Sequence, residues 1–460
     1  MSVDLEAIRP CFEGIVPAIV ATCARDGEPN VIYVSQLYFV DAKRVALSCQ
    51  FFNKTRRNID ENPYASVIVN HPVTFEAYRF ALRFDHLEKE GPLFDTMAAR
   101  IDMIASHTGM TGIFRLLSAD VYDVLSVEPL EGFLLPDDAP SAASAPPLPA
   151  GPLTEIRGLQ AVCERIGRAT DLEHLLGGTL AALDELFGFS HSMVFVPSDA
   201  PTTLVAIASR GYGDRGVGAE LPFGCGVVGT VAQRRRMMRV AGVGVELHYG
   251  RAIRGRVEES GGRAAPEIPL PGLPDVQAQL ALPLLAGDRL VGVLAVESRD
   301  PLHFDEWDEA FLQIVGSQIA LGIDRMQHHD DEADAHAAAP ARPARPAAGT
   351  GKKRAFCYYR NDDCVFVDGE YLVRNVPAKI LWKVLGLYGR EGRTEFTNRE
   401  LRLDPGLGLP AVKDNLESRL ILLRKRLQEK CPDVRLVPVR RGRFALELDS
   451  AIELVERETG

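Results

Sequence analysis

The sequence of 460 residues has no long hydrophobic run and no closely spaced pair of cysteines. A membrane-spanning helix needs about 20 consecutive apolar residues, and no stretch approaches that length, so we expect no membrane span. The N-terminus, Met1-Ser2-Val3-Asp4-Leu5-Glu6, is acidic and lacks the pattern of a secretory signal. The eight cysteines are scattered without a C-x-x-C pair, which argues against a zinc site or a disulfide framework and favours a reducing cytoplasm.

The chain is too long for one hydrophobic core, and we expect about three domains. Two segments, 136–151 and 327–352, are rich in Pro and Ala and show no periodicity. Such compositions bury too little apolar surface to offset chain entropy, so both segments are predicted to be linkers. They divide the chain into residues 1–135, 152–326 and 353–460. His328, His329 and His336 of the second linker are either metal ligands or, as its composition favours, solvated side chains.

The charge of the chain is unevenly distributed. The whole chain has a net charge of −11, whereas residues 351–460 contain 22 Lys and Arg against 17 Asp and Glu, a net charge of +5. Residues 1–350 therefore carry −16. A basic final segment suits a polyanion partner without proving one.

The first segment has the pattern of a small β-barrel. Apolar and alternating runs predict strands over 15–22, 31–40, 64–70 and 120–127, and residues 92–106 predict a helix. Strands that follow one another with one or two helices between them are typical of such barrels.

A strand in this segment leads into a short basic helix that ends at Asn62-Pro63. Lys54, Thr55 and Arg56 lie in its first turn, where backbone N–H groups and these side chains suit a phosphate. A solvated basic helix is the alternative interpretation, and the spacing alone leaves both open.

The same stretch resembles the flavin-phosphate segment of pyridoxamine 5'-phosphate oxidase-like split barrels, over roughly residues 10–130. The resemblance implies a barrel that dimerises and binds FMN. In such a site Lys54 and Thr55 hold the phosphate with Arg56 and Asn58 nearby, Ser48 and Gln50 lie beside the ribityl chain or ring, and Val34 and Ser35 lie against the ring.

The oxidases of this family end in an Arg-containing segment that binds the vitamin's phosphate, whereas Leu134-Leu135-Pro136 and a linker stand here. This difference argues against vitamin B6 oxidation. Flavin reduction, flavin sensing, or a barrel adapted to haem or a deazaflavin remain open. His71 and His107 are the histidines to consider as haem ligands, although a surface or core role is the commoner one.

The second segment resembles a GAF domain, a sensory module with a six-stranded sheet and flanking helices. The resemblance rests on the turn at 224–229, the hairpin at 283–294 and the helix that starts at Phe304-Asp305 and runs to Met326. It implies an unknown small-molecule ligand. A polar insert at about 241–276 is either a lid or, as we expect, a loop. Cys225 lies where a redox sensor would hold a thiol, although a lone cysteine is more often inert.

The third segment resembles the winged-helix output domains of response regulators. It has β segments at 364–373, a helix opened by Pro377, a capping box at Thr397–Glu400 and a helix predicted over 412–430 as the longest of the segment. A hairpin with the basic tip Arg440-Arg441-Gly442 follows. The resemblance implies DNA contacts from Lys413, Arg419, Arg440, Arg441 and Arg443.

These patterns predict a multidomain α+β protein: a split β-barrel, then a GAF α/β sensory domain, then a winged helix-turn-helix. The favoured hypothesis is a cytoplasmic, dimeric transcriptional regulator that senses a small molecule or redox state. A flavin-dependent oxidoreductase with regulatory domains and a non-enzymatic signalling scaffold are the alternatives. No constellation of general acid, base or nucleophile appears in the sequence, so any chemistry would be the flavin's own.

Overall fold

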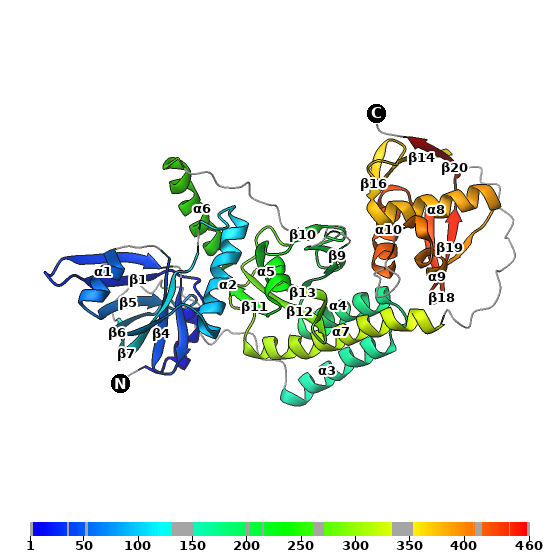
Figure 1. Cartoon of the computed structure of the whole chain (residues 1–460). Coiled ribbons are helices and arrows are strands. Elements are labelled where there is room, and N and C mark those ends of the chain that lie inside the picture. Colours follow the sequence, from blue (N-terminus) through cyan, green and yellow to red (C-terminus); the bar gives the residue numbers. More distant parts are fainter. Residues whose placement is uncertain are drawn as a thin grey trace.

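The computed structural model describes residues 3–34, 36–50, 54–113, 115–130, 151–198, 200, 202–213, 216–261, 271–333, 353–407, 409, 416–440 and 442–457. These residues form an N-terminal unit (3–130), a central unit (151–333) and a C-terminal unit (353–457), which lie in a row (Figure 1). Within the described ranges, no helix is long and apolar enough to cross a membrane.

The N-terminal unit is built on one seven-stranded antiparallel sheet of order β2-β1-β5-β6-β7-β4-β3. Val20 of β1 and Leu37 of β3, near opposite ends of that order, are buried in the same hydrophobic cluster, so the sheet curls around its core. Its elements are the 3-10 helix η1 (Glu6–Phe12), β1 (Ala18–Cys23), β2 (Pro29–Val34), β3 (Leu37–Asp41), β4 (Arg44–Cys49), α1 (Lys54–Glu61), β5 (Tyr64–Asn70), β6 (Ala77–Glu88), α2 (Pro92–His107) and β7 (Ser118–Leu130).

Two features of this sheet differ from the sequence prediction. The single strand predicted over 31–40 is wrong, because β2 pairs with β1 whereas β3 pairs with β4. Buried Gln36 lies between the two strands, and its side-chain amide nitrogen Nε2 donates to the Phe12 carbonyl, 2.8 Å away. The twelve-residue strand β6 was not predicted, although the alternation of Tyr78, Phe80 and Leu82 signals it.

The central unit has a six-stranded sheet of order β10-β9-β8-β13-β12-β11. Asp171 caps α4 by accepting a hydrogen bond from the His174 N–H, and Gly188 ends that helix in the left-handed conformation. The elements are α3 (Gly151–Arg168), α4 (Leu172–Phe187), β8 (His191–Pro197), β9 (Thr203–Arg210), β10 (Glu220–Pro222), α5 (Gly226–Arg234), β11 (Met238–Ala241), α6 (Val243–Glu259), β12 (Ala278–Ala286), β13 (Arg289–Ser298) and α7 (Glu306–Ala333).

The two faces of this sheet are covered by different parts of the chain. Helices α3, α4 and α7 pack on one face around a cluster that includes Leu176, Leu294 and Val315. On the other face, Met97 and Ile104 of helix α2 share a second cluster with residues of α5 and the sheet. The N-terminal and central units therefore share this second hydrophobic cluster, which we call the shared core.

The insert predicted as a loop over 241–276 contains helix α6, so that prediction is wrong for residues 243–259. Helix α6 packs on α2, and Gly250 lies so close to Thr108 and Ile104 that a Cβ there would meet their side chains at 2.8–2.9 Å. This packing partner lies in another unit, which explains why the local sequence did not reveal the helix. The glycine-rich turn continues directly into α5, and α7 extends to Ala333, into the segment predicted as a linker.

The C-terminal unit combines two small sheets with three α-helices. One sheet has the order β16-β15-β14-β20, and the other has the order β17-β19-β18. The elements are β14 (Lys353–Tyr359), β15 (Cys364–Val367), β16 (Glu370–Arg374), α8 (Asn375–Glu391), β17 (Glu395–Thr397), α9 (Asn398–Arg402), the 3-10 helix η4 (Pro405–Leu407), α10 (Leu416–Lys430), β18 (Val434–Arg440), β19 (Arg443–Leu448) and β20 (Ala451–Arg457).

The capping box predicted in this unit is confirmed: Thr397 Oγ1 accepts from the Glu400 N–H, and a Glu400 carboxylate oxygen accepts from the Thr397 N–H. Helix α8 starts two residues before Pro377. The helix predicted as the longest, α10, has 15 residues from Leu416, whereas α8 has 17. Residues 411–415, including Lys413, lie outside the described residues.

Candidate functional site

The first turn of helix α1 rests on the β1–β2 hairpin. Lys54 Nζ lies 2.6 Å from Glu28 Oε1 and 3.3 Å from the carbonyl oxygen of Pro29. Thr55 Oγ1 accepts a hydrogen bond of 2.9 Å from the Asn30 side chain and keeps its own proton for another acceptor. Because the Lys54–Glu28 pair is at the surface, separating it costs about 0–1 kcal/mol. Lys54 and Thr55 can therefore turn toward an anion.

Arg56 has a different role. Its guanidinium lies 2.8 Å from Asp120 and 2.9 Å from Asp60, and it also stacks 5.0 Å from the centre of the Phe84 ring. Asp120 is buried on β7 and accepts a further hydrogen bond from Ser118 Oγ at 2.7 Å. The positive charge of Arg56 is thus balanced by two carboxylates, and the side chain ties α1 to β7.

Asn58 is also internal, because it is buried and its Nδ2 donates to Thr22 Oγ1 at 3.2 Å. Gln50 Nε2 donates to Ser48 Oγ at 3.1 Å, while the buried Gln50 Oε1 has no hydrogen-bond partner among the described residues. An acceptor left in this state costs stability until a donor reaches it. Gln50 thus fits a bound group that carries an N–H or O–H.

The two residues predicted to lie against a flavin ring occur at the end of β2. Val34 is half-buried and packs against the core of the N-terminal unit, and Ser35 lies outside the described residues. His71 is engaged as well, since its Nδ1 accepts from the N–H groups of Val73 and Thr74. Over the described ranges, no group of three or more His, Cys, Asp or Glu side chains could hold a metal ion.

A cavity of about 270 Å³ lies on the second face of the central sheet. Its wall comes from α5, α6, β12, β13 and the segment 271–276, and His107 of α2 completes it from the N-terminal unit. Ser106 beside it accepts a hydrogen bond of 2.8 Å from the Gly226 N–H at the start of α5, and Arg254 of α6 donates to the Thr108 carbonyl at 2.9 Å. The wall is thus held by contacts between two units.

Glu297 is the buried carboxylate of this cavity, 7% exposed. Its oxygens accept from Tyr212 Oη at 3.0 Å, from the Leu273 N–H at 2.7 Å and from Gln279 Nε2 at 2.9 Å. Burial raises the pKa of Glu297, and burial together with the Glu297 charge raises the pKa of Tyr212. The cavity therefore offers a buried hydrogen-bonding carboxylate in a wall that combines apolar side chains with the polar side chains of His107, Arg251 and Gln279.

Cys225 lines the same cavity, directly before the first residue of α5. The thiol is half-buried, and burial raises its pKa. A thiol in that state is a poor nucleophile at neutral pH, since the thiolate is the reactive form. The redox role predicted for Cys225 stays a prediction.

The basic residues predicted for DNA contact are only partly described. Arg441 and Lys413 lie outside the described residues, as does the side chain of Arg440. Arg443 lies 3.7 Å from Glu395 and lines a cavity between the C-terminal and central units. Arg419 lines a different cavity between the same units, so the structure does not bring these two side chains together.

Comparison with protein families accounts for two of the units. A model described as pyridoxamine 5'-phosphate oxidase matches residues 5–124, and one described as GAF domain matches residues 171–323. The N-terminal unit is pyridoxamine 5'-phosphate oxidase-like, and the central unit is a GAF domain. The 270 Å³ cavity therefore belongs to the GAF domain and is completed by the pyridoxamine 5'-phosphate oxidase-like domain. No curated protein matches the chain.

Solved structures resemble the two domains separately. The GAF domain of an Acinetobacter phosphoenolpyruvate-protein phosphotransferase is 19% identical, with 38% of this chain and 95% of that chain covered and a TM-score of 0.32. A free methionine-R-sulfoxide reductase from Neisseria meningitidis in complex with its substrate is 20% identical, with 38% of this chain and 92% of that chain covered and a TM-score of 0.31. An FMN-binding protein from Syntrophomonas wolfei is 19% identical, with 28% of this chain and 90% of that chain covered and a TM-score of 0.23.

Proposed function

We propose that the chain is a signal-responsive transcriptional regulator. The pyridoxamine 5'-phosphate oxidase-like domain and the GAF domain sense a small molecule or redox state, and the C-terminal unit binds DNA as a winged helix. The observation that carries the proposal is the element order after the GAF domain: a β-sheet, the helices α8, α9 and α10, and the hairpin β18–β19 with basic residues at its turn. In a winged helix, the third helix enters the major groove and the hairpin contacts the backbone.

FMN is the cofactor proposed for the first domain. Lys54 and Thr55 would hold its phosphate, and the Gln50 acceptor would receive a hydrogen bond from the ribityl chain or the ring. For Arg56, which is paired with Asp120 and Asp60, we propose a structural role beside the phosphate site rather than direct contact with the phosphate. Bound flavin would supply one- or two-electron redox chemistry, which suits a sensor of redox state.

The GAF cavity is proposed to take a small ligand with an N–H or O–H group. The Glu297 carboxylate is the acceptor for that group, and the volume of about 270 Å³ limits the ligand to the size of a metabolite. His107 reaches this cavity from the first domain. Occupancy of the GAF cavity can therefore affect both domains.

A homodimer through the first domain is proposed as well. Val31 and Tyr33 on β2 are 64% and 69% exposed, and β2 is at one end of the strand order. Large apolar side chains on an edge strand mark a surface that pairs with another chain.

Two measurements test these proposals. The absorbance spectrum of the purified chain should show a flavin doublet, whereas a Soret band would indicate haem, and the absence of visible absorption would remove FMN from the proposal. Turnover of NAD(P)H or oxygen without an effect on DNA binding would favour a flavin-dependent oxidoreductase instead.

DNA binding is tested by selection from random-sequence duplexes at low salt, followed by titration of the selected DNA. Arg443→Gln should weaken binding and reduce the salt slope by about 1, as expected for one lost phosphate contact. Arg457→Gln removes the same charge from an exposed position on β20 and should leave the affinity unchanged. Absence of binding, also in variants that release the C-terminal unit from the GAF domain, would overturn the regulator proposal.

A further inference from the structure

Helix α10 is covered on both of its faces. One face carries Leu416, Leu420 and Leu423, which lie in the core of the C-terminal unit. The opposite face, which we call the outer face, is defined by Ser418, Ile421, Leu422 and Lys425. Every residue from Leu416 to Leu427 is buried or half-buried, so most of the outer face is shielded from solvent.

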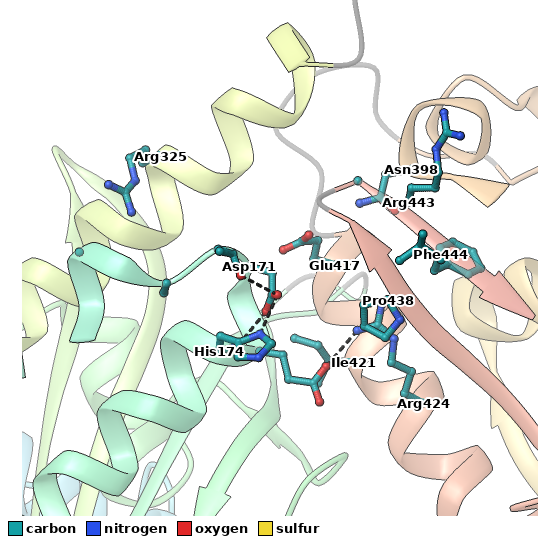
Figure 2. A pocket seen from close by; sticks show the side chains of 16 residues that line it. Asp171, His174, Arg325, Asn398, Glu417, Ile421, Arg424, Pro438, Arg443 and Phe444 are labelled. Atoms are coloured by element: carbon teal, nitrogen blue, oxygen red, sulfur yellow. Dashed lines mark hydrogen bonds and ion pairs between the residues drawn. The ribbon is translucent and has the colours of Figure 1, made fainter. Parts of the chain in front are cut away.

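The start of helix α4 of the GAF domain covers one side of the outer face (Figure 2). Ile421 is only 8% exposed and belongs to the hydrophobic cluster of the GAF domain. Glu417 Oε2 accepts a hydrogen bond of 3.3 Å from the Leu172 N–H, and Arg424 Nη1 lies 2.9 Å from Glu173 Oε2. This contact thus combines apolar burial, a bond to a helix N-terminus and an ion pair.

The region of β9 and β10 covers the other side. Leu422 and Arg426 lie over Gly218, where an added Cβ would come within 2.9 Å of each side chain. Arg374 Nη2, at the end of β16, lies 2.6 Å from Glu220 Oε2 on β10. Two separate parts of the GAF domain therefore hold the C-terminal unit in one orientation.

The hairpin of the C-terminal unit faces the same way. A cavity of about 740 Å³ remains between the units, and Arg443 of β19 lines it together with Asn398 of α9 (Figure 2). The proposed recognition helix and the proposed wing thus both face the GAF domain.

The GAF domain contacts basic side chains of the C-terminal unit that could also bind the phosphates of a nucleic acid. Glu173 and Glu220 present carboxylates to Arg424 and Arg374, as phosphates of a DNA backbone would. An α-helix fits the major groove only when its outward side is free. The docked GAF domain and a DNA duplex therefore cannot contact the outer face at the same time.

We propose that this contact is an autoinhibitory one, in which the GAF domain and DNA compete for the outer face of α10. The inference rests on the proposed function, because it assigns the regulation of the same DNA-binding helix. A signalling ligand activates the chain by favouring the undocked state. The size of this shift is set by how much more tightly the ligand binds the undocked state than the docked state.

The test loosens the contact from the GAF side, so that the DNA-binding unit stays intact. Glu173 and Glu220 are 54% and 44% exposed, and Glu173→Gln with Glu220→Gln removes both ion pairs without a buried change. Each surface pair shifts an equilibrium by up to about fivefold, so the double variant of the full chain should bind selected duplex DNA up to about 25-fold more tightly. Hydrogen exchange of the amides of 416–427 should become faster in parallel.

The control separates docking from net charge. Glu258→Gln with Glu259→Gln makes the same charge change on α6, away from the contact, and should leave DNA affinity and exchange as in the wild-type chain. Faster exchange without tighter DNA binding would refute autoinhibition while leaving DNA binding in place. Equal tightening by the control pair would also refute it. Faster exchange with no DNA binding by any variant at low salt would overturn the proposed function itself.

Discussion

The ion pair of Arg56 and Asp120 gives the sharpest test of how the first domain uses its basic helix. The side chains are 19% and 8% exposed, and their charged atoms are 2.8 Å apart. Arg56→Ala leaves the Asp120 carboxylate buried, with the Ser118 hydroxyl 2.7 Å away as a donor. If Arg56 serves the fold rather than a phosphate, this change destabilises the domain.

The size of the effect follows from the geometry. At 2.8 Å and an effective dielectric constant of about 20, the direct attraction is about 6 kcal/mol, and the desolvation of both charges opposes it. Removal of one partner from a buried pair costs about 3–5 kcal/mol. Because a fifth of Arg56 remains exposed, we expect a loss of about 2–4 kcal/mol in the free energy of unfolding.

The assay is native-state hydrogen exchange of the amides in β4 and β7, which reports local unfolding free energies. Tryptophan fluorescence is unsuitable, because the two tryptophans, Trp307 and Trp382, lie in the other units. Arg57→Ala is the matched control, since Arg57 is the exposed neighbour on α1. The double variant with Asp120→Ala should recover most of the loss. Unchanged exchange in Arg56→Ala with weakened FMN binding would refute this argument and return Arg56 to the phosphate site.

Three further predictions concern the other units. Burial raises the pKa of Glu297, so the GAF domain should lose stability as pH rises from the ordinary carboxyl range through the raised pKa. Glu297→Gln should flatten this pH dependence in thermal melts followed by Trp307 fluorescence. Since burial also raises the pKa of Cys225, its alkylation, measured on its peptide by mass spectrometry, should be slow at neutral pH and accelerate at alkaline pH; rapid labelling at neutral pH would contradict this. Thr397→Ala removes the cap of α9 and should cost about 1 kcal/mol in denaturation followed by Trp382 fluorescence. Thr394→Ala, outside the capping box, should cost less.

The parts of the fold that could be predicted from sequence are those with local signals. The helix over 92–106, the capping box at Thr397 and the hairpin around Gly442 each depend on residues within a few positions of one another, and the structure confirms them. The two family resemblances of the first two domains are confirmed for the same reason, because their motifs are contiguous.

The parts that escaped prediction depend on distant partners. Helix α6 mixes charged residues with the apolar Leu247 and Ile253, and it is positioned by α2, more than a hundred residues earlier. The role of Arg56 is decided by Asp120, which the first-turn pattern of α1 cannot reveal. The sequence offers His107 only as a haem candidate, whereas this side chain lines the GAF cavity from another domain. Local patterns identify the elements, and contacts across the chain decide what their side chains do.

The shared core of the first two domains has a consequence for how this chain could be rearranged. Met97 and Ile104 of α2 are buried against residues such as Val227 and Val231 of α5, so a cut between the two domains would expose both apolar surfaces to water. A GAF fragment expressed alone is therefore expected to aggregate or to recruit a substitute for α2. Recombination that exchanged the first domain for another sensor would need a helix of matching shape. The two domains are therefore expected to fold, and to need engineering, as one module, despite their two family signatures.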